Sequence, residues 1–138
     1  MTLRSVLIID DSEFDRYMLR QQLLQEKISS HIIEHENGQA AIDYLNTPSS
    51  DEHFPPELIF VDANMPVMDG EEFLKHFQNV SSQLPELSNS TVVMFTSSEC
   101  SESERMEKYG CANGYITKMP NSSEELKEAL QPLFPSLH

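Results

Sequence analysis

The strongest constraint on the fold is a series of short apolar runs, each of which stops at a polar or charged residue. Short runs rich in β-branched residues are typical of strands buried in a parallel sheet. The segments between them carry apolar residues at helical spacing. Strand and helix therefore alternate, which predicts an α/β fold with helices on both faces of a parallel sheet and right-handed crossovers. The runs cover residues 5–9, 31–36, 58–61, 91–95 and 114–117, and the predicted helices cover residues 12–27, 40–45, 71–80, 102–109 and 122–133.

Caps and loops support this division of the chain. Ser12 and Ser122 are suited to cap the first and last helices, and Gly110 is suited to end the fourth. Two polar segments, residues 46–56 and 81–90, are predicted to be long surface loops. The apolar residues of the first helix are Phe14, Tyr17, Met18, Leu19, Leu23 and Leu24.

Charge and length exclude several classes of protein. Nine Lys and Arg against 23 Asp and Glu give a net charge of −14, which disfavours binding to nucleic acid or to an anionic membrane surface. No apolar run approaches the roughly 20 residues of a membrane-spanning helix. The two cysteines, Cys100 and Cys111, lack metal-binding spacing and are expected to be reduced thiols in the cytoplasm. At 138 residues we expect one domain, residues 1–138, with no output domain.

Polar and charged residues follow four of the predicted strands, at the point where each strand ends. Asp10 and Asp11 follow the first strand, and Asp62 follows the third. Thr96 and Lys118 follow the fourth and fifth. Because sites in open parallel sheets form beyond the carboxyl ends of the strands, these side chains are predicted to share one crevice.

Three carboxylates in one crevice repel each other, so either a carboxyl pKa rises or a cation binds among them. Mg²⁺ suits such oxygen ligands, and Mn²⁺ is also possible. An acid cluster with a metal ion, a lysine and a hydroxyl is suited to phosphoryl transfer, because the cations hold the phosphoryl oxygens while a carboxylate attacks in line.

These motifs resemble those of the response-regulator receiver domains of two-component signalling, including the chemotaxis receivers. The resemblance spans nearly the whole chain and is carried by residues 7–12, 61–70, 96–98 and 114–118. The second segment is the most specific, since its acid is followed by Met-Pro and then Met-Asp-Gly. The resemblance implies a doubly wound, flavodoxin-like sheet of five parallel strands in the order 2-1-3-4-5, with five helices.

The resemblance also implies how the site works. Asp62 would be the phosphoacceptor, taking a phosphoryl group from a histidine kinase or a histidine phosphotransfer protein. Asp10, Asp11, Asp62 and the backbone carbonyl of Asn64 would hold Mg²⁺, Asp11 directly and Asp10 largely through water. We expect no enzymatic activity beyond the protein's own phosphorylation and dephosphorylation.

Further roles follow from the same resemblance. Thr96, Ser97 and Lys118 would bind the phosphoryl group, and Thr96 with Tyr115 would form the switch. Asn64 and Ser98 would tune dephosphorylation.

The first predicted helix carries the candidate residues for partner binding. Phe14 and Arg16, on the first helix, are candidates for docking the phosphodonor, although Phe14 could equally lie in the core, and Arg16 with Arg20 could be ordinary surface charges. A downstream protein target is expected, and the sequence is compatible with either a monomer or a homodimer.

The chain departs from the family at the loop after the fifth predicted strand. The family usually has a proline directly after the lysine, whereas here Met119 separates Lys118 from Pro120. We expect the peptide bond before Met119 to be trans, because a cis bond to a non-proline residue costs roughly 2.5–4 kcal/mol.

Three other functions compete with this interpretation. A receiver-like module could bind partners without phosphorylation. A phosphatase with an aspartyl nucleophile would want a second acid two residues after Asp62, where Asn64 stands. A flavin mononucleotide protein would need a phosphate loop rich in Ser, Thr and Gly after the first strand, where acids stand instead.

Overall fold

The computed structural model describes the chain except residues 1, 48, 66, 98–100, 119–121 and 138. It contains the predicted parallel sheet, in the flavodoxin-like order β2-β1-β3-β4-β5. The strands are β1 (Val6–Ile9), β2 (Ile32–His35), β3 (Leu58–Val61), β4 (Thr91–Thr96) and β5 (Gly114–Thr117). The α-helices are α1 (Glu13–Gln25), α2 (Gly38–Leu45), α3 (Gly70–Gln83), α4 (Glu102–Tyr109) and α5 (Ser123–Leu130).

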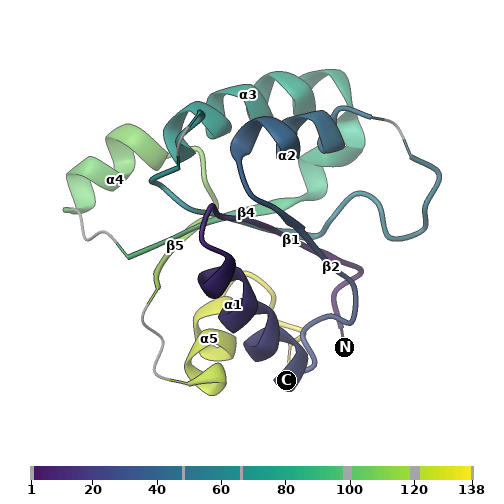
Figure 1. Cartoon of the computed structure of the whole chain (residues 1–138), viewed down its shortest axis with the longest axis vertical. Helices are drawn as coiled ribbons and strands as arrows, with labels where there is room; N and C mark the ends of the chain where they lie inside the picture. The colour runs from purple at the N-terminus through teal and green to yellow at the C-terminus, as the bar shows by residue number, and fades with distance from the viewer. Residues whose placement is uncertain (1, 48, 66, 98–100, 119–121, 138) are drawn as a thin grey trace.

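The sheet forms the middle of three layers. Figure 1 shows α2, α3 and α4 on one side of it and α1 with α5 on the other. Because side chains alternate along a strand, each inner strand supplies both layers. Leu7, Ile9, Ile59 and Val61 pack with α2 and α3, whereas Val6, Ile8, Leu58 and Phe60 pack with α1 and α5.

The chain from residue 81 to residue 90 was predicted to be a loop, and the structure corrects this. Helix α3 extends to Gln83, and a 3₁₀ helix, η1 (Pro85–Asn89), follows directly. The reason is burial, because Val80 and Leu87 are both covered by the core and hold the polar segment against it. At the other end of the chain, α5 stops at Leu130, so that Leu133 follows the helix instead of lining it.

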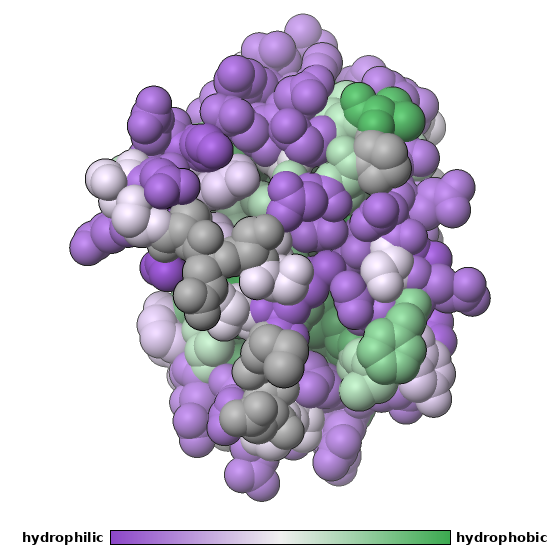
Figure 2. Space-filling view, turned by 60° about the vertical axis from the view of Figure 1, so that its left-hand side comes forward, coloured by the Kyte–Doolittle hydropathy of each residue, from purple (hydrophilic) through white to green (hydrophobic). Residues whose placement is uncertain are grey.

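Helix α1 buries less of its apolar surface than its sequence pattern indicates. Only Leu19 and Leu23 are buried. The exposed apolar side chains of this helix are Phe14, Tyr17, Met18 and Leu24. Figure 2 shows one face of the molecule, mostly hydrophilic with a few separate hydrophobic patches. Among the described residues, none of the helices is long and apolar enough to cross a membrane.

Strand register and one close backbone contact set the position of Asp62. Ile9 pairs with Val61, and the amide of Asp62 donates to the carbonyl of Ile9 at 3.0 Å. Gly70 then begins α3 directly against this turn, and its amide donates to the carbonyl of Ala63 at 3.0 Å. A Cβ on Gly70 would lie 2.8 Å from the carbonyl oxygen of Asp62 and 2.9 Å from the Cα of Ala63.

We predict that Gly70→Ala lowers the free energy of unfolding by about 1–3 kcal/mol, because the added methyl must displace backbone. The matched control is Gly114→Ala, whose Cβ would lie 3.1 Å from the flexible end of Leu133. Urea denaturation of the three proteins gives the comparison. Equal losses in the two variants would contradict the prediction.

Candidate functional site

Three carboxylates meet at the carboxyl edge of the sheet, as the sequence predicts. Asp10 follows β1 and Asp62 follows β3, and both are buried, whereas Asp11 is exposed. One oxygen from each carboxylate lies within 4.8 Å of the others. Neighbouring strands that run parallel end at the same edge, which explains why residues 52 positions apart in sequence meet here.

Local hydrogen bonds hold the two buried carboxylates in place. The amide of Asp10 donates to the carbonyl of His35, and its Oδ1 accepts from the amide of Ser12 at 2.9 Å. Oδ1 of Asp62 accepts from the amide of Asn64 at 3.4 Å. Asp10 is therefore fixed by the turn into α1, and Asp62 by the turn that leads towards α3.

Lys118 brings a buried cation to this cluster. Its Nζ lies 2.5 Å from Oδ2 of Asp10 and 3.4 Å from Oδ2 of Asp62. A third carboxylate, from Asp15 on α1, lies 2.9 Å away. The Lys118 side chain is 8% exposed, and its backbone amide donates to the carbonyl of Thr96 at 2.8 Å. The ammonium group is thus enclosed by acids that follow β1 and β3 and by an acid of α1.

The electrostatics of the site keep Lys118 charged and disfavour the charge on Asp62. Burial raises the pKa of the Asp62 carboxyl, even though the nearby Lys118 ammonium acts in the opposite direction. Burial by itself would lower the pKa of Lys118. Hydrogen bonds to Asp10 and Asp15, together with the charges of Asp10 and Asp62, outweigh burial, so the pKa of Lys118 is raised.

The donor set fits a hard divalent cation. Asp10, Asp11 and Asp62 supply carboxylate oxygens within reach of one ion, and oxygen is the ligand that Mg²⁺ and Mn²⁺ prefer. One ammonium cannot balance these acids together with Asp15, so a further positive charge would be stabilised. Asn64 is exposed and follows Asp62 by two residues, so its backbone lies at the same turn.

The remaining predicted residues lie on the β4 and β5 side of the sheet. Thr96 is fully buried at the end of β4, and Ser97 next to it is exposed. Tyr115 on β5 is half-buried, and the guanidinium carbon of Arg105 lies 4.5 Å from the centre of its ring. Ser98, Met119 and Pro120 lie outside the described residues.

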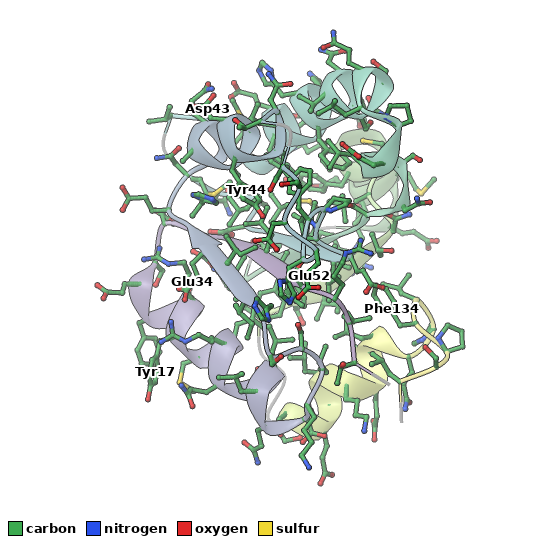
Figure 3. The ribbon with its side chains drawn as sticks, turned by 90° about the vertical axis from the view of Figure 1, so that its right-hand side faces the viewer. Tyr17, Glu34, Asp43, Tyr44, Glu52 and Phe134 are labelled. Atoms are coloured by element: carbon green, nitrogen blue, oxygen red, sulfur yellow. The ribbon has the colours of Figure 1, made fainter. Side chains whose placement is uncertain are left out.

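Arg16 proves to be part of the fold, a role that sequence reasoning missed. Its Nη1 donates to the backbone carbonyl of Asp10 at 2.5 Å, and its Nε pairs with Glu34 at 3.2 Å. Arg20 contacts the same carboxylate at 2.5 Å. Figure 3 shows Glu34 on the α1 side of β2 and Tyr44 on the α2 side. With 14% of its side chain exposed, Arg16 offers a partner little surface, and it is not an ordinary surface charge.

Asp15 is the second residue that sequence reasoning missed. The available signal was its place in the first turn of α1, four residues after Asp11. That spacing allows an approach to the site, but the helix could equally have turned Asp15 to solvent.

Phe14 lies on the surface, where a docking residue must be. Its side chain is 70% exposed, so it does not belong to the core. Together with Met18 and Leu19 it lines a groove of about 260 Å³. Phe95 and Lys118 line the same groove, which therefore extends from α1 to the Lys118 side chain.

Comparison with known proteins gives one family. A family model described as the response regulator receiver domain matches residues 6–131. Response regulator Rcp1 of Synechocystis is 31% identical over 124 residues, which cover 88% of this chain and 81% of that protein. Chemotaxis protein CheY of Halobacterium salinarum is 34% identical over 119 residues, which cover 83% of this chain and 84% of that protein. The crystal structure of the Mn²⁺-bound form of Rcp1 superposes with a TM-score of 0.71 at 28% identity, covering 97% of this chain and 96% of that one.

We predict that Asp62→Asn raises the free energy of unfolding at pH 7 when a chelator removes divalent cations. A raised pKa means that the fold disfavours the ionised carboxylate, and the amide removes that charge. For an acid with a raised folded pKa, the linked stability is complete below the ordinary value of 3.8 and is lost as the pH rises through the folded pKa. The advantage of the variant should therefore grow with pH above 3.8.

Urea denaturation at several pH values measures this difference. The control variant is Glu107→Gln, which removes an exposed carboxylate from α4 and should show no such trend. A variant less stable than the wild type at pH 7 would contradict the prediction.

Proposed function

The chain belongs to the response regulator receiver family, and on that premise we propose that it is a phosphoacceptor signalling protein of a two-component system. In this proposal Asp62 takes a phosphoryl group from a histidine kinase or a histidine phosphotransfer protein. The observation that carries the proposal is the buried Asp62 carboxylate, which lies in an acid cluster with the Lys118 ammonium 3.4 Å away. A nucleophile and a cation for the phosphoryl oxygens therefore stand side by side.

The chemistry is an in-line displacement. An oxygen of Asp62 attacks the phosphorus, the bond from phosphorus to the donor imidazole nitrogen breaks, and the imidazole leaves with its electron pair and takes up a proton. Lys118 orients the phosphoryl oxygens and balances their charge. Mg²⁺ or Mn²⁺, when bound by Asp10, Asp11, Asp62 and the carbonyl of Asn64, would neutralise charge on the carboxylates and on the transferred group.

A change of surface would follow phosphorylation. The added charge and acceptor oxygens give Thr96 and Ser97 a new hydrogen-bonding partner at the mouth of the sheet. Tyr115 would then change its position, which alters the surface formed by α4 and β5 where Arg105 now covers its ring. The phosphoryl group can shift this equilibrium only by the difference in its affinity for the two states. Asn64 and Ser98 would set how long the modification lasts.

Phe14 and the groove beside it are the proposed docking surface for the phosphodonor. An exposed aromatic next to a groove that reaches Lys118 would place a partner's histidine near Asp62. Arg16 is left out of this surface because Asp10 and Glu34 already engage it. Among the described residues, helix α1 also carries more exposed large apolar side chains than any other element.

We predict that incubation with Mg²⁺ and acetyl phosphate adds one phosphoryl group to the wild-type protein, measured as intact mass. The gain should be absent in Asp62→Asn, because no nucleophile remains, and absent with a chelator, because the carboxylates then repel the donor. Circular dichroism of the variant checks that it is folded. An equal gain in Asp62→Asn would disprove the assignment of Asp62.

We also predict that Phe14→Ala slows phosphoryl transfer from a phosphorylated histidine phosphotransfer protein by about tenfold, the loss expected for an aromatic anchor at an interface. Transfer from acetyl phosphate should stay unchanged, since that donor needs no docking surface. Leu24→Ala is the control, because Leu24 is exposed on the same helix but does not line the groove. Equal protein-to-protein rates in the two variants would remove Phe14 from the docking surface.

A further inference from the structure

Asp15 holds Lys118 from outside the candidate metal cluster. Its Oδ2 accepts a hydrogen bond from Nζ at 2.9 Å. The other two carboxylates around the ammonium, those of Asp10 and Asp62, belong to the group that could hold a metal ion, and Asp15 does not. Asp15 is therefore the one acid in contact with Lys118, among the described residues, whose oxygens are not needed as metal ligands.

Lys118 and a divalent cation would draw on the same two carboxylates, those of Asp10 and Asp62. Its ammonium lies 2.5 Å from Oδ2 of Asp10 and 3.4 Å from Oδ2 of Asp62. Two cations that share these carboxylates repel each other strongly at such distances. A metal ion held by these carboxylates therefore weakens their hold on the ammonium.

An ammonium that loses its partners in a buried place is costly. The Lys118 side chain is only 8% exposed, so water can replace the lost acids only in part. Asp15, at 38% exposed, stands at the outer side of the site and already contacts the same Nζ. It can keep the ammonium paired without taking an oxygen from the metal ligands.

We propose that Asp15 is a positioning residue that anchors the Lys118 ammonium while Asp10 and Asp62 are engaged by a divalent cation. The inference rests on the proposed function, because it takes the carboxylate cluster to be a metal site. It adds a residue of α1 to the site. It also gives that residue a defined task, which is to let Lys118 and the metal ion coexist beside the phosphoacceptor.

The test is the affinity of the whole protein for Mg²⁺, measured by calorimetry without a phosphodonor. Asp15→Asn keeps the shape of the side chain and removes its charge. It should weaken Mg²⁺ binding by about fivefold, because the displaced ammonium then lacks a counter-ion. Asp15→Glu restores a carboxylate and should bind within about twofold of the wild type.

Glu13→Gln is the matched control. Glu13 is an exposed acid in the same first turn of α1, so this variant removes one negative charge from the same region. Its effect on Mg²⁺ affinity should stay within about twofold, since only general electrostatic attraction is lost. The α1 cap does not depend on the Asp15 side chain, because it is the Asp15 backbone amide that donates to Ser12 Oγ.

A double-mutant cycle distinguishes an effect of Asp15 that acts through Lys118 from an effect of Asp15 on the metal ion that does not need Lys118. In Lys118→Met no ammonium needs an anchor, so adding Asp15→Asn should weaken Mg²⁺ binding no more than Glu13→Gln does. A loss in Asp15→Asn that equals the loss in Glu13→Gln would overturn the inference, and so would a fivefold loss that persists in Lys118→Met. Failure of the wild type to bind Mg²⁺ would instead overturn the metal site of the proposed function, and this inference with it.

Discussion

The buried ammonium group of Lys118 constrains how the surrounding strands and helices are arranged. Nζ of Lys118 has three carboxylate neighbours, which come from the end of β1, from α1 and from the end of β3. A buried cation is tolerable only if it is paired and hydrogen-bonded, so these elements must keep their relative positions. The same contacts leave more negative than positive charge at the edge of the sheet. That surplus is what makes the place suitable for a metal ion and a phosphoryl group.

The parallel sheet makes this arrangement possible. The side chains of each inner strand point alternately to the layer of α2 and α3 and to the layer of α1 and α5. Helices therefore cover both faces of the sheet, and only the strand ends remain open. Arg16 then links the backbone of Asp10 to Glu34 on β2, which fastens α1 to the edge that carries the site. Packing therefore fixes the positions of acids that would otherwise drive one another apart.

Sequence patterns predicted the parts of this site that follow from topology. Asp10, Asp62, Thr96 and Lys118 each end a strand, and strand ends meet whatever the details of packing. The position of Asp15 and the partners of Arg16 could not be predicted this way, because they depend on the rotation of α1 over the sheet. The 3₁₀ helix after α3 was missed for a related reason. Its polar sequence is typical of a loop, and the burial of Leu87 holds this helix against the core.

The proposed function depends on Asp62, rather than another acid at the same edge, accepting the phosphoryl group. The most direct measurement is reduction of the phosphorylated protein with borohydride, which converts an aspartyl phosphate into homoserine, followed by mass spectrometry of the peptides. We expect homoserine at position 62 and unmodified Asp10, Asp11 and Asp15. Reduction at any of those other acids, with position 62 unchanged, would contradict it.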